Sequence, residues 1–173
     1  MVSEILFTFL ILAVGIERLF ELKVANRNRS WSLQQGGQEH SSGHYPFMVV
    51  IHTALLFGAL AEVWIFKRSV DAVMAVSMLV LVICAQGLRW WVIKTLGPMW
   101  NTRIIVVPGF RRVDGGPFKY LAHPNYIAVA VEGFALPLVH NAWMTALIFS
   151  LCNAGLMWVR ITEEEKALRL LKI

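Results

Sequence analysis

The sequence predicts an all-α integral membrane protein with about five transmembrane helices. Apolar residues make up 57% of the 173 residues, and the mean hydropathy of +0.60 is well above that of an ordinary soluble domain. Charged residues account for only 16% of the chain. The positive ones lie at the ends of apolar stretches rather than in one basic stripe, which argues against nucleic acid as a partner.

Five apolar stretches justify the helix count, because a transmembrane helix needs about 20 mostly apolar residues. They cover residues 2–22, 46–66, 70–96, 126–138 and 142–159. The first has no lysine or arginine before it and no small-residue cleavage site, so we expect it to be retained rather than removed as a signal peptide. The fourth is short and contains Glu132 and Pro137, so we expect it to be tilted or broken.

The basic residues between these stretches predict the orientation. One face receives only Lys67 and Arg68. The other face receives Lys23, Arg27, Arg29, Arg103, Arg111, Arg112, Lys119, Arg160, Lys166, Arg169 and Lys172. Because basic residues are retained preferentially in the cytoplasm, we expect the N-terminus outside, the C-terminus inside, and one membrane domain covering residues 1–173.

Two polar segments fall on the predicted cytoplasmic face. Residues 26–45 contain a Gly-Gly pair and many hydrogen-bonding side chains, so we expect a loop, with or without a short interfacial helix. The glycines and prolines of residues 97–125 exclude one continuous helix and favour turns between short apolar pieces such as 104–107. Any chemistry is expected at this surface.

Some polar residues lie inside the apolar stretches, where an unpaired charge is costly. We expect Arg18 and Arg89 to extend their side chains toward the membrane surface and Glu62 to reach water at the outer end. His52 is interpreted as a hydrogen-bonded residue between helices. Glu132 lies deeper in its stretch and is a functional candidate.

The two cysteines, Cys84 and Cys152, also lie in apolar stretches and lack paired spacing. We expect buried packing thiols, with no disulfide framework and no metal site. Trp100 fits an interfacial aromatic belt and alternatively lines an access route for a lipophilic substrate.

The first cluster that suggests chemistry is GGPFKYLAHPNY, residues 115–126. Pro124 suits the first turn of a helix, so we expect His123 and Asn125 at a helix N-terminus, where backbone N–H groups attract an anion such as a carboxylate. The glycines allow close backbone approach to a ligand. The alternative is an interfacial loop whose aromatic residues anchor the membrane and whose polar residues cap a helix.

The second cluster closes the last apolar stretch. If the helix continues, Arg160 and Glu164 share one face, and the glutamate would orient the guanidinium group for an anion. The remaining charges of this segment are interpreted as a solvated helix end with local ion pairs: Glu163, Glu165, Lys166 and Arg169.

The motif GGPFKYLAHPNY, followed by an apolar hairpin and RITEEEKAL, resembles the isoprenylcysteine carboxyl methyltransferase family of integral membrane enzymes. The resemblance covers roughly residues 97–168, with a catalytic half at about 97–173. More narrowly, the chain is similar to the short bacterial branch, some of whose members are linked to O-methylation of lipophilic polyketide products such as alkylpyrones. The resemblance implies an S-adenosylmethionine-dependent O-methyltransferase of a bacterial inner membrane, acting on a carboxylate or acidic hydroxyl of a lipophilic substrate.

The resemblance also implies a cofactor pocket at the cytoplasmic face, between the last two helices and the preceding loop. The implied cofactor-binding residues are Gly116, Tyr120, Leu121, His123, Pro124, Asn125, Tyr126 and Glu164. Arg160 and Glu164 are the implied catalytic residues, with Arg112, Trp100 and Glu132 as substrate contacts. Ala122 stands where family members commonly have arginine, which Arg111 or Arg112 would have to replace.

Three other functions are compatible with these motifs. An NADPH-dependent membrane sterol or enone reductase carries a related His-Pro-x-Tyr and glutamate-rich ending, but the basic cluster for a 2′-phosphate and the family's aromatic tail are missing here. A phospholipid N-methyltransferase would need a base such as Glu132 or Glu164 for its neutral amine. The third is a non-catalytic membrane scaffold. The expected partners are the lipid bilayer and a lipophilic or prenylated substrate that enters from it, while the sequence leaves the oligomeric state open.

Overall fold

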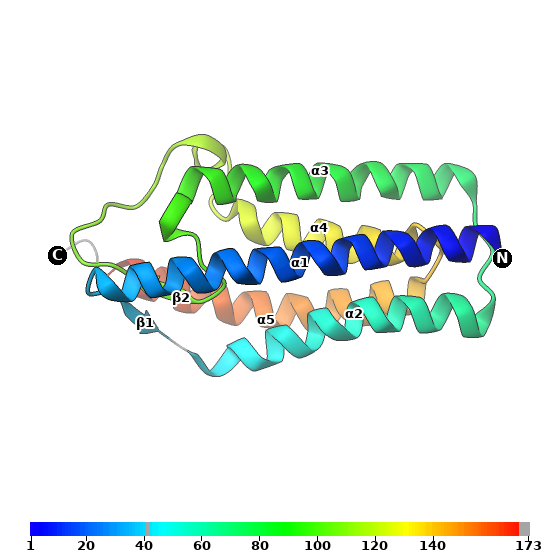
Figure 1. Ribbon diagram of the computed structural model, residues 1–173, viewed down its shortest axis with the longest axis horizontal. Helices are drawn as coiled ribbons and strands as arrows, with labels where there is room; N and C mark the ends of the chain where they lie inside the picture. The colour runs from blue at the N-terminus through cyan, green and yellow to red at the C-terminus, as the bar shows by residue number, and fades with distance from the viewer. Residues whose placement is uncertain (41, 170–173) are drawn as a thin grey trace.

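The computed structural model describes residues 1–40 and 42–169, so Lys172 lies outside the described residues. The helices α1 (Val2–Gln34), α2 (Tyr45–Phe66), α3 (Ala72–Leu96), α4 (Pro124–Leu138) and α5 (Trp143–Arg169) lie side by side in one elongated bundle (Figure 1). At one end lie the strands β1 (Gln38–His40) and β2 (Ile104–Val106) and the 3₁₀ helices η1 (Ser42–His44), η2 (Gly97–Met99) and η3 (Gly116–Lys119). The all-α membrane fold class is confirmed, with a small sheet that the sequence did not reveal.

Three of the helices are long and apolar enough to cross a membrane, namely α2, α3 together with η2, and α5, with mean hydropathies of 2.0, 2.0 and 1.5. Large apolar side chains such as Phe57, Val73 and Leu151 are exposed on their outer surfaces, as a hydrocarbon environment requires. The helix α1 carries charges in its middle, and α4 has only 15 residues. Gly133 of α4 leaves room for the ring of Phe149 on α5, so these two helices pack closely.

The first helix is longer than the sequence suggested. It continues to Gln34, so the loop expected over residues 26–45 begins only after that residue. The extra turns are fixed by tertiary contacts: the amide of Asn28 donates to the carbonyl oxygens of Gly97 and Trp100, at 3.1 and 2.8 Å. Glycines at 36 and 37 then end the helix.

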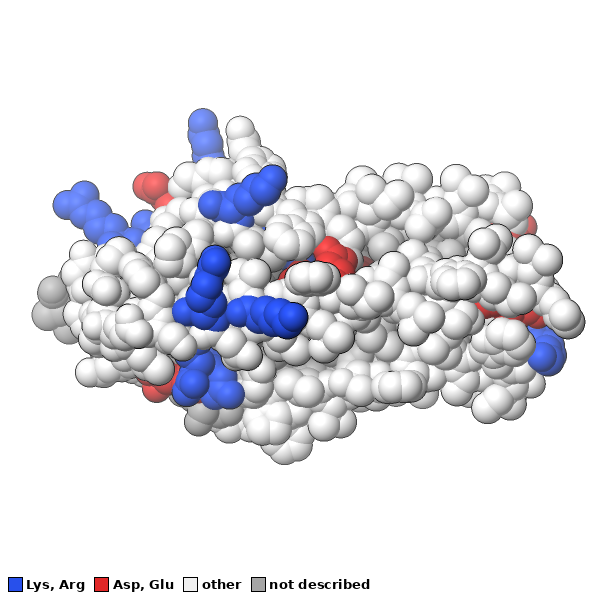
Figure 2. All heavy atoms as spheres, in the orientation of Figure 1, with Lys and Arg blue, Asp and Glu red and all other residues white. Residues whose placement is uncertain are grey.

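The end of the bundle that carries the sheet is called the basic end here, because most lysine and arginine side chains gather there (Figure 2). The strands pair antiparallel, with Gln38 opposite Val106 and His40 opposite Ile104. Between them, Glu39 pairs with Arg103 at 2.5 Å and with Arg29 at 3.0 Å. The apolar piece expected between turns at 104–107 is therefore largely a strand, because β1 supplies its hydrogen-bonding partner.

At the opposite end, the structure corrects two expectations. Glu62 is buried rather than in water, and it accepts hydrogen bonds from the backbone N–H groups of Thr145 and Met144 at 2.7 and 3.2 Å. It therefore caps the start of α5. Along the bundle, Cys84 and Cys152 are free and exposed rather than buried, because a lipid-facing surface accepts a thiol as readily as a core does.

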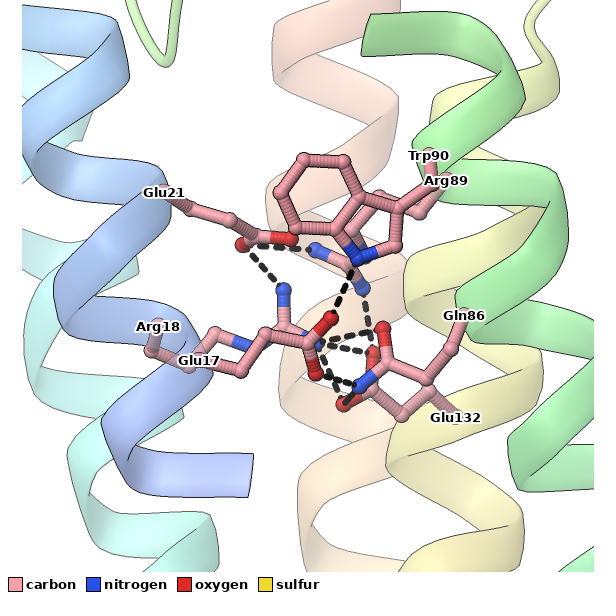
Figure 3. A network of polar contacts seen from close by, with 7 residues as sticks. All are labelled: Glu17, Arg18, Glu21, Gln86, Arg89, Trp90 and Glu132. Atoms are coloured by element: carbon pink, nitrogen blue, oxygen red, sulfur yellow. Dashed lines mark hydrogen bonds and ion pairs between the residues drawn. The ribbon is translucent and has the colours of Figure 1, made fainter. Parts of the chain in front are cut away.

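A network of polar side chains lies inside the bundle, between α1, α3 and α4 (Figure 3). Its members, called the core network below, are Glu17, Arg18, Glu21, Gln86, Arg89, Trp90 and Glu132. Glu132 pairs with Arg18 at 2.5 Å and also with Arg89. Glu21 pairs with Arg18 and lies 3.6 Å from Arg89. The expectation that the two arginines extend to the membrane surface is wrong, because the carboxylates provide partners inside the bundle.

Candidate functional site

The two sequence clusters meet at the basic end. The hydroxyl of Tyr126, in the first turn of α4, donates a hydrogen bond to the carboxylate of Glu164 near the end of α5. One residue before α4, Nε2 of His123 lies 3.4 Å from Oε1 of Glu165. The helix begins at Pro124 with His123 as its N-cap residue, as the proline predicted. Segments 38 to 42 residues apart in the chain therefore form one site.

Arg160 is buried in this site, with only 7% of its surface exposed. Its guanidinium group donates to the carbonyl oxygen of Thr102 and to Sδ of Met48, both at 3.0 Å, and lies 5.7 Å from the ring centre of Tyr126. Among residues 1–40 and 42–169, no carboxylate forms an ion pair with it, so the expected pair with Glu164 is not present. A buried arginine whose described contacts are all with neutral groups is unusual, because a buried charge is costly without a counter-charge.

The first of two neighbouring cavities, called the loop cavity, has a volume of about 180 Å³ and lies among the loops of the basic end. Its wall includes the start of α4, the strand β2 and the end of α5. Arg111 and Arg112, which could bind an anion, line it together with Arg103, which is already paired with Glu39. The residues expected to replace the missing charge at position 122 therefore line the same cavity as Ala122.

The second cavity, called the membrane cavity, has a volume of about 170 Å³ and lies deeper in the bundle. Much of its wall is apolar, including Val49, Leu56 and Leu156. Three core-network residues also line it: Arg18, Glu21 and Arg89. A cavity of this composition suits a lipophilic molecule with a polar group.

The two cavities share part of their walls. The shared residues, called the junction below, are Trp100, Asn101, Asn125, Tyr126 and Arg160. Two buried polar atoms of the junction have no hydrogen-bond partner among the described residues: Nε1 of Trp100 and Oδ1 of Asn125. Because buried polar atoms are nearly always paired in native proteins, the junction has unused hydrogen-bonding capacity for a ligand.

Most of the charged side chains that line the loop cavity are arginines. Burial, followed by the nearby charge of Arg160, lowers the pKa of His44, although Glu163 acts in the opposite direction. His44 is therefore neutral at pH 7, and the cationic character of this region comes from its arginines.

The structure brings most of the implied site residues together. The loop cavity is lined by Arg112, Trp100, His123, Pro124, Asn125, Tyr126, Arg160 and Glu164. Gly116, Tyr120 and Leu121 do not line it. Gly116 packs against Thr95 of α3, and Tyr120 is 72% exposed. Glu132 lies in the core network and lines only a small inner cavity of about 20 Å³.

Sequence reasoning missed several residues of the site. Met48 and Thr102 hold Arg160, and neither has a side chain that suggests chemistry. Asn101, which belongs to the junction, was missed as well. Glu21 and His52, which line the membrane cavity, are marked as candidates by the sequence because each is an ionisable residue inside an apolar stretch, although His52 was interpreted as a hydrogen-bonded residue between helices.

Comparison with known proteins identifies relatives of this chain. The model of the isoprenylcysteine carboxyl methyltransferase family matches residues 78–170. The uncharacterized protein YpbQ of Bacillus subtilis is 35% identical over 164 residues, which cover 95% of this chain and 97% of that protein. An uncharacterized protein of Haemophilus influenzae is 26% identical over 152 residues, covering 87% of this chain and 88% of that protein. No solved structure matches significantly.

Proposed function

The chain belongs to the isoprenylcysteine carboxyl methyltransferase family, and on that premise we propose that it is an S-adenosylmethionine-dependent O-methyltransferase of a lipophilic, membrane-resident acceptor. The methyl-accepting group is a carboxylate or an acidic hydroxyl. The observation that carries the proposal is the pair of cavities that meet at the junction. One cavity suits a polar cofactor and the other a lipophilic acceptor.

The loop cavity fits the chemical groups of S-adenosylmethionine. The carboxylate of the cofactor matches the N-terminus of α4 and the arginines at 111 and 112. Its ammonium group and ribose hydroxyls match the carboxylate of Glu164, which Tyr126 orients by a hydrogen bond. The unpartnered atoms of Trp100 and Asn125 offer one donor and one acceptor. When bound, S-adenosylmethionine supplies a methyl group on a positively charged sulfur.

Arg160 is proposed to hold the accepting oxygen at the junction. Because its contacts among the described residues are with Met48, Thr102 and the ring of Tyr126, and none is an ion pair, its charge is available for an anionic ligand. A carboxylate has an ordinary pKa near 4 and is ionised at pH 7, so its oxygen needs no general base. The protein then contributes mainly by positioning the reactants and by excluding water.

The proposal places the basic end in the cytoplasm of a bacterial cell and the bundle in its inner membrane. Its support is the gathering of lysine and arginine at that end. The polar cofactor would enter from the cytoplasm, and the acceptor would enter the membrane cavity from the bilayer. An amine acceptor is less well supported, because of its two candidate bases Glu132 is already paired with two arginines and Glu164 is bound by Tyr126 and assigned to the cofactor.

Cofactor binding tests the proposal without knowledge of the acceptor. Purified protein in detergent is titrated with S-adenosylhomocysteine and, separately, with NADPH in a calorimeter. We expect binding of the first only, weakened by His123→Ala and unchanged in the control Lys166→Ala, whose side chain pairs with Glu163 outside the loop cavity. Binding of NADPH without binding of S-adenosylhomocysteine would contradict the proposal and favour a reductase.

A further inference from the structure

The membrane cavity holds polar atoms that the methyl transfer does not use. Glu21 is 5% exposed and uses Oε2 for both of its arginine contacts, while Oε1 has no hydrogen-bond partner among the described residues. In the adjacent guanidinium group, Nε of Arg89 also lacks a partner. One unused acceptor and one unused donor therefore belong to two neighbouring side chains, 3.6 Å apart between Glu21 Oε2 and Arg89 Nη1, and both residues line the cavity.

His52 adds a second acceptor to the same cavity. Its Nδ1 lies 2.8 Å from the carbonyl oxygen of Met48, so Nδ1 carries the ring proton and Nε2 is left as an acceptor. Within the described ranges, nothing hydrogen-bonds to Nε2. The ring packs edge-on against Phe149 at 5.4 Å, which fixes its orientation.

These groups lie farther from the basic end than the accepting oxygen would. Met48 contacts Arg160, and His52 follows it by one turn of α2, a rise of about 6 Å. The charges near this point come from three helices: Arg18 and Glu21 from α1, Arg89 from α3, and Glu132 from α4. Since the three carboxylates of the core network outnumber its two guanidinium groups, a second anion is not favoured there.

We propose that Glu21, Arg89 and His52 form a hydroxyl-binding subsite of the membrane cavity, which recognises a second, neutral oxygen group on the head of the methyl acceptor. A hydroxyl is suited to this place because it donates one hydrogen bond and accepts another, whereas an ether cannot donate. The inference rests on the proposed function and narrows its substrate class. The acceptor is a lipid whose head carries the oxygen to be methylated, held by Arg160, and a hydroxyl that is not methylated.

Three synthetic ligands with the same saturated tail test the subsite. Each is a meta-alkylbenzoate, whose carboxylate suits Arg160, and the other meta position carries a hydroxyl, a methoxy group or hydrogen. Their affinities are measured by equilibrium competition on protein loaded with S-adenosylhomocysteine in lipid nanodiscs. We expect the hydroxyl compound to bind about fivefold to tenfold more tightly than the hydrogen compound, the effect of one or two net hydrogen bonds. The methoxy compound should bind more weakly than both.

Variants of His52 locate the effect. In His52→Leu the preference for the hydroxyl compound should fall below about twofold, while His52→Gln, which retains an acceptor near the position of Nε2, should restore it. The matched control is His140→Phe, because His140 is a buried histidine at the other end of the bundle whose ring nitrogens have no hydrogen-bond partner among the described residues. The preference of the His140→Phe variant for the hydroxyl compound over the hydrogen compound should equal that of the unmodified protein.

Each failure has a different meaning. Equal affinities for the hydroxyl and hydrogen compounds would show that water alone fills the subsite, and this comparison needs no variant. An unchanged preference in His52→Leu would also overturn the inference, as would failure of all three compounds to bind the cofactor-loaded protein. Absence of S-adenosylhomocysteine binding would remove the proposed function itself.

Discussion

The core network and the junction both bury arginine, but they treat its charge differently. In the core network, Arg18 and Arg89 each face two carboxylates. In the junction, Arg160 is held by a backbone carbonyl, a thioether and an aromatic ring. The two regions lie in the same bundle, and the membrane cavity touches both.

This difference indicates that the arginines of the core network hold the helices together, whereas Arg160 is suited to bind a ligand. A guanidinium group that is paired inside the protein joins helices, and its removal leaves an uncompensated carboxylate in an apolar environment. A guanidinium group held by neutral partners has no counter-charge within its contacts. An anionic ligand that binds there can provide that counter-charge. We therefore expect loss of the core-network ion pairs to act mainly on stability, although Glu21 and Arg89 also line the membrane cavity, and changes in the junction to act mainly on methyl transfer.

The largest effect is expected for Glu132→Ala. It removes one of the two carboxylates that Arg18 and Arg89 share, and removal of one member of a buried ion pair costs about 3–5 kcal/mol of unfolding free energy. Thermal unfolding in detergent, followed by circular dichroism, measures this loss. A quadruple variant with leucine at positions 18, 21, 89 and 132 should be less destabilised, because it removes both members of each of these buried ion pairs. Unchanged stability of Glu132→Ala would contradict the structural role.

Arg160→Ala should show the opposite pattern. We expect methyl transfer to an anionic acceptor to fall about 100-fold, the usual scale for a lost charge-stabilising contact, with unfolding free energy changed by about 1 kcal/mol or less. Initial rates with radiolabelled S-adenosylmethionine and thermal unfolding of the same preparation give both values. Arg160→Lys is the control for charge alone and should recover part of the rate. A stable variant with a normal rate would remove Arg160 from the site.

A smaller effect is expected for Tyr126→Phe. The variant keeps the ring beside Arg160 but loses the hydroxyl that binds Glu164. Loss of one such hydrogen bond, worth about 1 kcal/mol, should weaken S-adenosylhomocysteine binding about fivefold in a calorimetric titration. If Glu164 does not contribute to the cofactor site, Tyr126→Phe and Glu164→Gln will both bind with normal affinity.

The smallest effect concerns the sheet at the basic end. Burial on its own would raise the pKa of Glu39, but hydrogen bonds from Arg103 and Arg29 outweigh it and lower that pKa below its ordinary 4.5. The stabilisation is therefore complete above pH about 4.5 and is lost as the pH falls through the lowered value. Amide exchange in residues 38–40 and 104–106 should be slower in the unmodified protein than in Glu39→Gln at neutral pH, with no difference once Glu39 is protonated. A difference that persists in acid would contradict this.

Local patterns predicted the parts of this molecule that depend on neighbours in the sequence. The apolar stretches indicated the helices, and Pro124 indicated the start of α4. The pairing of residues 38–40 with 104–106 was not predictable in this way, because three-residue strands are stabilised only by a distant partner. Arg18 and Arg89 also find carboxylate partners on other helices. The expectation that a lone arginine in an apolar stretch extends to the membrane surface therefore placed both side chains wrongly.

The candidate site shows the same limit. The residues of the two motifs were identified from their order and spacing, and their meeting through Tyr126 and Glu164 agrees with that identification. The pairing of Arg160 with Glu164 was inferred from helical spacing, yet tertiary contacts with Met48 and Thr102 direct the guanidinium group elsewhere. Spacing on one helix shows which residues share a face, but contacts with other elements decide which partner each side chain binds.

An experimental structure with S-adenosylhomocysteine, determined in lipid nanodiscs, tests the central claim most directly. The account predicts that the nucleoside occupies the loop cavity beside His123 and Glu164, with its sulfur facing Arg160 across the junction. A nucleoside bound elsewhere, or a sulfur separated from the membrane cavity by intervening protein, would contradict it.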